Sequence, residues 1–194
     1  ITLVRQALAG DASRFSAPRL QEVVDRIRSL DTVKGEAPFE ERAQQGWLAY
    51  SLMAGGKGWA RPLLQLGAGV VGPHSAYQGV NAITAAVAAN DATAVNALLD
   101  AGALPNSIIA EVPRIFGARQ AEVEAAAGQM MPLAVFGTAA GATEAVAQLA
   151  KAGAMLDLTN NRGETPLSVA AAQQNEPAVR ALLEARRLEM GHAR

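Results

Sequence analysis

The stretch that decides the fold is GVNAITAAVAANDATAVNALLDAGA, which occupies residues 79–103. Its two alanine-rich halves favour helices, because alanine has the highest helix propensity and its small side chain lets helices pack closely. Asn90 interrupts the pattern between the halves, and a valine-x-x-leucine-leucine spacing at 95–99 gives the second half one apolar stripe. Gly102 then supplies the left-handed residue that commonly ends a helix. The stretch therefore predicts two helices packed against each other.

The same pattern occurs three more times in the chain. It returns at 131–157 and 163–185, and more faintly at 46–68. The separations are 35, 50 and 34 residues between the equivalent positions Trp47, Ala82, Pro132 and Pro166. A nearly fixed period of this size is the signature of a repeat protein in which each unit covers its neighbour. The longer middle separation indicates an insertion, which we place at 107–129.

Three motifs resemble the ankyrin repeat: Gly163-x-Thr165-Pro166-Leu167, Leu98-Leu99-x-Ala101-Gly102-Ala103 and Ala152-Gly153-Ala154. The ankyrin period is about 33 residues, and the resemblance covers about residues 43–186. It implies an all-α, ankyrin-type helical repeat solenoid of about four repeats. In the first motif, threonine can cap the N–H groups of a helix and proline fits the first turn. The chain departs from the family where a histidine usually follows the leucine, and has instead Ala49, Thr84, Ala134 and Ser168.

The segments that flank the array are expected to cover its ends. Apolar residues at helical spacing after Ser16-Ala17-Pro18 predict a capping helix, and they are Leu20, Val23, Val24, Ile27 and Leu30. We therefore divide the chain into an N-terminal helical cap and linker (1–42), a repeat array (43–190) and a C-terminal tail (191–194). Arginine and glutamate residues between 180 and 189 predict a polar, solvated outer face on the last helix.

Composition argues against several functional classes. The net charge is -1 and the isoelectric point is about 6.2, so no strong field attracts nucleic acid or an anionic membrane. No apolar run is long enough to span a membrane. The chain contains no cysteine, which excludes disulfides and thiolate metal sites. Aromatic residues make up only 4% of the chain, which argues against an aromatic-filled sandwich or barrel.

No motif predicts a catalytic, cofactor or metal site. Gly55-Gly56-Lys57-Gly58 lacks both the first glycine of a phosphate-binding loop and the serine or threonine after the lysine, so we interpret it as a turn. The two histidines, His74 and His192, are far apart in the sequence. The carboxylate pairs at 40–41 and 122–124 fit solvated helix faces. We predict that the chain is not an enzyme; the alternative, an activity within the insertion, would depend on Glu111, Glu122 or His74.

The insertion at 107–129 is the largest departure from a regular array. Pro113 can start a helix that runs to about Ala127, and Gly117 weakens this helix. One hypothesis is that the insertion folds back on its own repeat. The other is that it projects and contacts a partner, because long inserts in repeat arrays form loops on one face and its arginine and apolar content is typical of interfaces.

Ankyrin arrays differ in their partners, so the resemblance implies a protein-binding module that is a monomer in isolation. The expected contacts are hairpin tips, the concave face and the insertion, and the candidate residues are His74, Tyr77, Asn106, Ile109, Arg114, Phe116, Arg119, Asp157, Asn160 and Arg162. The alanine-rich composition indicates a bacterial source, and small bacterial ankyrin-like proteins include antagonists of secreted toxins. An immunity protein for a cognate toxin is the first hypothesis, and an accessory scaffold for an enzyme or stress-response protein is the alternative. The start at Ile1 indicates a processed or trimmed N-terminus, which leaves cytoplasm and periplasm open.

Overall fold

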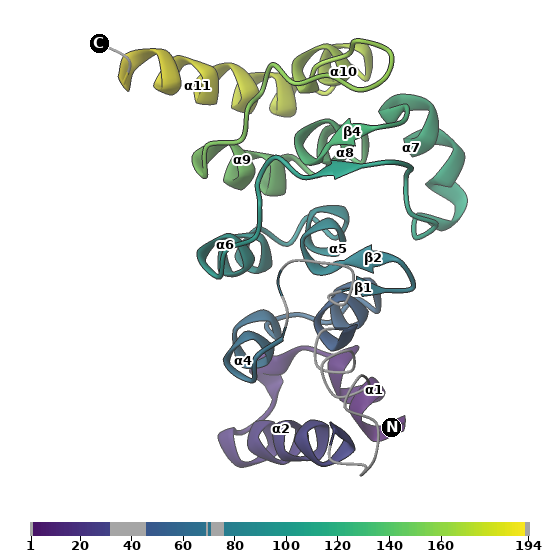
Figure 1. Cartoon of the computed structure of the whole chain (residues 1–194), viewed down its shortest axis with the longest axis vertical. Coiled ribbons are helices and arrows are strands. Elements are labelled where there is room, and N and C mark those ends of the chain that lie inside the picture. The colour runs from purple at the N-terminus through teal and green to yellow at the C-terminus, as the bar shows by residue number, and fades with distance from the viewer. Residues whose placement is uncertain (1, 32–45, 69, 71–75, 193–194) are drawn as a thin grey trace. The chain divides into compact units, whose positions relative to one another are not determined.

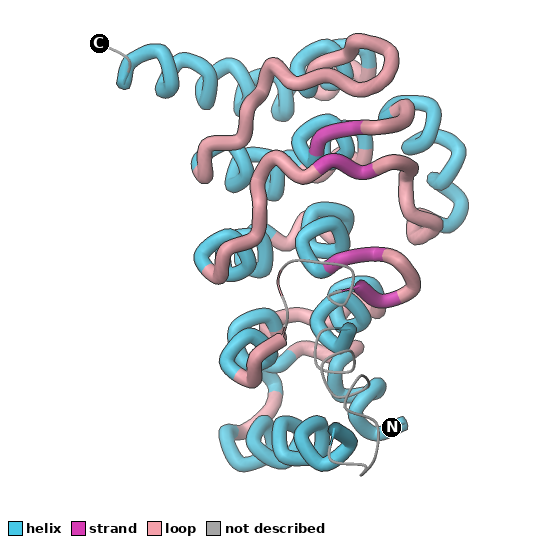
Figure 2. The backbone as a smooth tube through the Cα atoms, viewed as in Figure 1, coloured by secondary structure: helices cyan, strands magenta, loops and turns pink. Residues whose placement is uncertain are grey.

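A computed structural model describes residues 2–31, 46–68, 70 and 76–192, and these are mostly helical, as the sequence predicts. Two short hairpins accompany the helices (Figures 1 and 2). The chain divides into two compact units, residues 1–103 and 104–194. This division falls inside the stretch 43–190 that the sequence analysis treats as one array.

The first unit begins with helix α1 (Thr2–Leu8), a 3-10 turn η1 (Ala12–Arg14) and helix α2 (Ala17–Asp31). The capping helix predicted from residues 20–30 is α2, whose Val23 and Ile27 are buried. Helix α1 is an addition that the sequence analysis does not predict. Its C-terminal end is fixed by backbone bonds from Ala12 N to Lys57 O (2.8 Å) and from Lys57 N to Gly10 O (3.1 Å).

The segment after α1 also fits closely against residues 51–59. Ser51 donates a hydrogen bond to Leu8 O (2.7 Å), and the Trp59 indole donates one to Gly10 O (3.0 Å). Gly56 is required at this contact, because a Cβ there would lie 1.9 Å from Leu8 O. The glycine-rich stretch 55–58 is therefore a packed turn between two helices, as predicted, and its backbone holds the N-terminal segment.

The rest of the first unit contains two helix pairs joined by a hairpin. A helix at 46–53 is followed by α4 (Ala60–Gln65), then by strands β1 (Ala76–Tyr77) and β2 (Val80–Asn81), α5 (Ala82–Ala88) and α6 (Ala92–Asp100). Asn81 caps α5 and Asp91 caps α6, each through a 2.9 Å bond from a backbone N–H. Asn90 (φ 51°) and Gly102 (φ 98°) take left-handed conformations, so the predicted break and helix end are both confirmed.

The second unit contains two further helix pairs, α8 (Leu133–Ala139) with α9 (Thr143–Lys151), and α10 (Pro166–Ala172) with α11 (Glu176–His192). Each pair packs on the next, α8 against α10 and α9 against α11. Their shared core consists of small and branched apolar residues: Ala134, Val146, Ala150, Leu156, Ala170, Ala178 and Leu182. Thr165 caps α10 with Pro166 in the first turn, as predicted, and Ser168 completes a capping box.

The insertion folds back on helix α8, which follows it in the chain, and does not project, as the first of the two hypotheses expects. It contains strand β3 (Ile108–Ile109), the 3-10 turn η3 (Gly117–Arg119) and helix α7 (Gln120–Ala127), and leads to strand β4 (Met131–Pro132). The Val123 and Ala127 side chains are fully buried, and α7 packs on α8. All seven residues of α8 are buried, and Figure 1 shows α8 between α9 and α7. Helix α7 thus covers one face of α8.

The helix of the insertion starts later than predicted, at Gln120 and not at Pro113. Gly117 has a φ of 54°, which a continuous right-handed helix cannot contain. The Gln120 side chain holds the preceding loop instead, because it accepts a hydrogen bond from Phe116 N (3.1 Å) and donates one to Pro113 O (3.2 Å). Gly117 therefore does more than weaken the predicted helix, since it delays the start.

Candidate functional site

The second unit carries a group of four large apolar side chains that are each more than half exposed. They are Leu104 (58%), Ile108 (54%), Met130 (56%) and Met155 (51%), which we call the hairpin-edge patch. All four belong to the β3–β4 hairpin or to the loops that enter it and follow α9. An exposed group of this kind requires an explanation, because folding normally removes such side chains from water.

The hairpin carries two of these side chains, Ile108 within strand β3 and Met130 immediately before strand β4. Strands β3 and β4 are antiparallel, with Ile109 opposite Met131, and Met130 N donates a hydrogen bond to Ala110 O (2.9 Å). Neighbouring residues of a strand point to opposite faces. Ile109 and the fully buried Met131 therefore share one face, and Ile108 shares the other face with Pro132, while Met130 precedes β4 with a positive φ (47°) and is 56% exposed.

Asn106 connects the two loops that carry the other exposed side chains of the patch, Leu104 and Met155. Its side-chain oxygen accepts a hydrogen bond from Met155 N (2.8 Å), which ties the loop after α9 to the loop that enters β3. Ser107 N and Oγ both donate to Leu104 O, so the loop between Leu104 and Ile108 is a tight turn. Met155 and Leu104 are therefore held on either side of Asn106.

Three of the predicted contact residues lie beside the patch. Asn106 is half-buried at its centre, Ile109 is half-buried in β3, and Asp157 is exposed two residues after Met155. Arg114 is also exposed, on the loop that follows β3. An apolar centre with a polar rim is the usual composition of a protein-binding surface. A contact role for these four residues stays a prediction.

Two other predicted residues pack against α8. The Phe116 ring meets the buried Phe136 ring edge-on, with 5.8 Å between their centroids. The Arg119 guanidinium donates to Ala140 O (3.2 Å), a carbonyl at the C-terminal end of α8. Both side chains hold the insertion on its own repeat, and each is still partly exposed.

Asn160 and Arg162 form a latch at the C-terminal end of α7. Asn160 is buried and donates to Ala127 O (2.8 Å), and Arg162 donates to Ala126 O (3.0 Å). These bonds satisfy two carbonyls that the helix end leaves unpaired. Gly128 (φ 70°) permits the close approach, because a Cβ there would lie 2.9 Å from Asn160 Nδ2. Sequence spacing gives no signal for this contact between segments more than thirty residues apart.

Glu164 completes the latch. It accepts hydrogen bonds from Asn160 Nδ2 (2.8 Å) and from Arg162 Nε (2.8 Å). The hydrogen bond from Asn160 is the main cause that lowers the pKa of Glu164 below its ordinary value of 4.5, and the hydrogen bond and positive charge of Arg162 lower it further. The carboxylate is therefore a structural acceptor within the loop.

Two of the predicted contact residues, His74 and Tyr77, belong to the first unit. Tyr77 lies edge-on to Tyr50 (5.1 Å between centroids), Tyr50 is in turn edge-on to Trp47 (5.8 Å), and Arg5 lies over the Tyr50 ring. Of the described residues, none accepts a hydrogen bond from the buried Trp47 Nε1. His74 lies outside the described residues, as does the carboxylate pair at 40–41.

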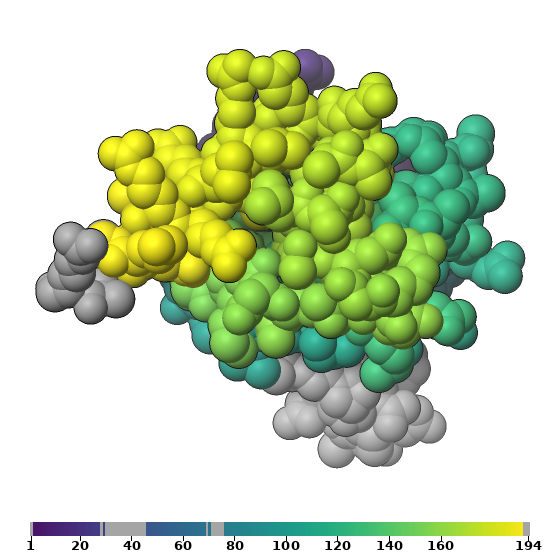
Figure 3. Space-filling model, turned by 90° about the horizontal axis from the view of Figure 1, so that it is seen from above, coloured from purple at the N-terminus to yellow at the C-terminus, as the bar shows by residue number. Residues whose placement is uncertain are grey.

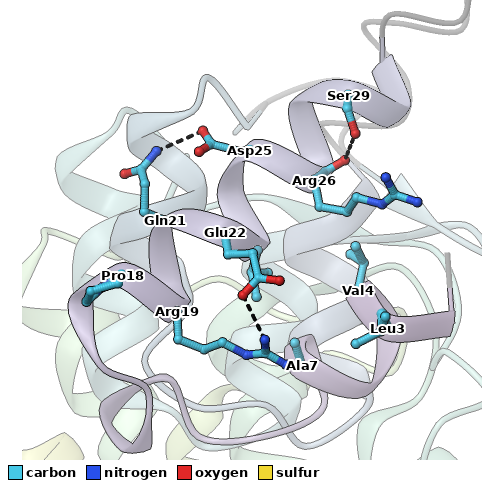
Figure 4. A pocket seen from close by; sticks show the side chains of 11 residues that line it. Leu3, Val4, Ala7, Pro18, Arg19, Gln21, Glu22, Asp25, Arg26 and Ser29 are labelled. Carbon is cyan, nitrogen blue, oxygen red and sulfur yellow. Dashed lines mark hydrogen bonds and ion pairs between the residues drawn. The ribbon is translucent and has the colours of Figure 1, made fainter.

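A groove of about 770 Å³ lies between α1 and α2 (Figure 4). Leu3, Val4 and Val23 give it an apolar lining, and Val4 and Val23 are buried. Charged side chains of both signs surround it, and Arg19 pairs with Glu22 at 2.7 Å. The other charged lining residues, Asp25 and Arg26, are again of opposite sign, so the lining has no excess of one charge, and we rank the groove below the hairpin-edge patch.

Within the described residues, no three histidine or acidic side chains gather as metal ligands, and no helix is long and apolar enough to cross a bilayer. Scanning the chain against models of known protein families gives no match, and searching the curated proteins gives none either.

Proposed function

We propose that this chain is an ankyrin-type repeat protein that binds a partner protein through the hairpin-edge patch. The repeat assignment is supported by recurring local structure. Left-handed residues stand at equivalent positions in different pairs, Asn90 with Gly141 between helices and Gly102 with Gly153 after them. Within the second unit the pairs stack α8 on α10 and α9 on α11, which is how repeats bury their apolar faces.

One observation carries the binding proposal: four large apolar side chains, each more than half exposed, stand on backbone segments that hydrogen bonds hold in place. Because these bonds order the backbone before binding, little backbone entropy is lost when a partner covers the patch. The insertion adds to the argument, because α7 covers α8 and leaves the hairpin edge exposed. We therefore place the partner on the hairpin edge, beside Asn106 and Asp157, and not on the face of α8.

The test is a pull-down with purified chain as bait and two matched variants. Met155→Glu places a charge in the patch, whereas Leu3→Glu makes the same change at a side chain of the first unit that is 66% exposed. We expect a specific protein to be retained by the original chain and by Leu3→Glu, and lost with Met155→Glu. A partner retained equally by both variants would rule out the patch.

The identity of the retained protein then separates the two partner classes that the sequence suggests. A toxin whose activity the chain inhibits supports the immunity hypothesis, and an enzyme that remains active in the complex supports the scaffold hypothesis. Rescue of toxin-poisoned cells by the chain, and its loss with Met155→Glu, connects the surface to that function.

A further inference from the structure

Two of the four side chains of the hairpin-edge patch are methionines. Met130 is 56% exposed and Met155 is 51% exposed, whereas the adjacent Met131 is fully buried. The chain has five methionines and no cysteine, so no thiol of its own competes with these sulfur atoms for an oxidant. The patch therefore carries oxidisable groups as well as apolar surface.

The backbone around both methionines is fixed by hydrogen bonds that do not involve the sulfur atoms. Met155 N donates to Asn106 Oδ1 (2.8 Å), and Met130 N donates to Ala110 O (2.9 Å). Both side chains are exposed, so neither belongs to the buried core. A polar change at either sulfur atom is therefore expected to alter the surface and to leave the fold intact.

The repeating pattern of the sequence shows that one of these positions also accepts leucine. Leu104 stands two residues after Gly102, and Met155 stands two residues after Gly153, so the two occupy the same position in the pattern. Both are more than half exposed. Leucine and methionine are similar in volume and apolar character, but leucine has no sulfur atom to oxidise. Methionine thus adds reactivity at a position where leucine supplies the same apolar surface.

We propose that peroxide oxidises Met130 and Met155 and that their oxidation releases the partner, an inference that rests on the binding proposed above. In each reaction the O–O bond of hydrogen peroxide breaks, one oxygen atom bonds to Sδ to form a sulfoxide, and water leaves. The sulfur is oxidised by two electrons and the peroxide is reduced by two. The sulfoxide oxygen is a polar group that an apolar contact of the partner leaves without a hydrogen bond, so binding weakens. Sulfoxide reductases return the sulfur to the thioether, which restores the patch.

The first test needs no partner. The purified chain is treated with hydrogen peroxide and digested, and fragmentation mass spectrometry follows the gain of one oxygen atom at each methionine, including the neighbouring pair 130–131. We expect Met130 and Met155 to oxidise at least about tenfold faster than Met131, because oxidation follows exposure. Retention on a phenyl resin should fall while far-UV circular dichroism stays unchanged. Equal rates for Met130 and Met131 would overturn the proposal.

The second test measures the affinity for the protein retained in the pull-down. The double variant Met130→Leu, Met155→Leu keeps the patch apolar but removes both sulfur atoms. Met190→Leu is the control, because Met190 is 70% exposed on the outer side of α11, which the sequence predicts to be polar. The last part of α11 is yellow in Figure 3 and lies at the surface.

Peroxide is removed with catalase before the partner is added, so that only this chain is oxidised. We expect oxidation to weaken binding more than about tenfold for the original chain and for Met190→Leu, and to leave the double variant unchanged. If Met155→Glu weakens binding but oxidation does not, or if oxidation weakens the double variant equally, the patch binds the partner and oxidation does not regulate it. If Met155→Glu leaves binding intact, the patch does not bind the partner, and both proposals are overturned.

Discussion

Replacing Asn160 with alanine should release the loop that caps α7. The side chain donates to Ala127 O and Glu164 Oε2, both at 2.8 Å, and accepts from the backbone N–H groups of Arg162 (2.9 Å) and Glu164 (3.0 Å). A typical hydrogen bond contributes about 1 kcal/mol net. The Glu164 bond is partly exposed and counts for less, so we expect a loss of about 3 kcal/mol.

Asn161→Ala is the matched control. Asn161 is the same residue type one position away, but it is exposed, and its side chain accepts a hydrogen bond from Gln129 N (2.9 Å). Water can replace that bond, so the expected loss is at most about 1 kcal/mol. Trp47 and Trp59 both lie in the first unit, so fluorescence is a poor probe of this region. Urea denaturation followed by circular dichroism gives the free energies, and hydrogen exchange of residues 120–128 gives the local effect. Equal losses for the two variants, or unchanged exchange in α7, would refute the latch.

Three further outcomes follow from the packing. Gly128→Ala should lower the free energy of unfolding by about 3 kcal/mol, and Gly153→Ala by about 1 kcal/mol, as measured by urea denaturation. Both glycines have a positive φ, but only at Gly128 would the added Cβ have other atoms within 3 Å. Equal losses for the two variants would contradict this difference. Folding lowers the pKa of Glu164, so its charged form stabilises the protein above about pH 4.5 and this contribution is lost as the pH falls further. Glu164→Gln should therefore show a smaller decline in stability between about pH 5 and 3, and an identical decline would count against the bond. Trp59→Phe should lower the free energy of unfolding by about 1–2 kcal/mol, because the hydrogen bond from the indole to Gly10 O is lost. The melting temperature should therefore fall, and an unchanged melting temperature would contradict this role of Trp59.

The sequence predicts the elements whose signals are local. Alanine-rich helices, the Thr165–Pro166 cap, the break at Asn90 and the helix end at Gly102 each depend on residues close together in the chain, and all appear in the structure. The folding back of the insertion could also be anticipated, because its apolar residues need a surface to cover. The residue at which α7 starts could not be anticipated, because it depends on the left-handed conformation of Gly117.

Contacts between distant segments were beyond prediction from one sequence. Asn160 looks like an ordinary turn residue until Ala127 is placed beside it, and the same is true of Trp59 and Gly10. The exposed patch was missed for a different reason. Leu104 and Met155 occupy apolar positions that look like core residues, and only their exposure in the folded chain distinguishes them.

The most direct test of the binding proposal is the dissociation constant of the captured partner for the Met155→Glu and Leu3→Glu variants. Residues at the centre of an interface commonly contribute about 2 kcal/mol or more, which corresponds to about thirtyfold in affinity. We predict a loss of this size for Met155→Glu and an unchanged constant for Leu3→Glu. Equal affinity for both variants and the original chain would contradict the claim that the hairpin-edge patch binds the partner.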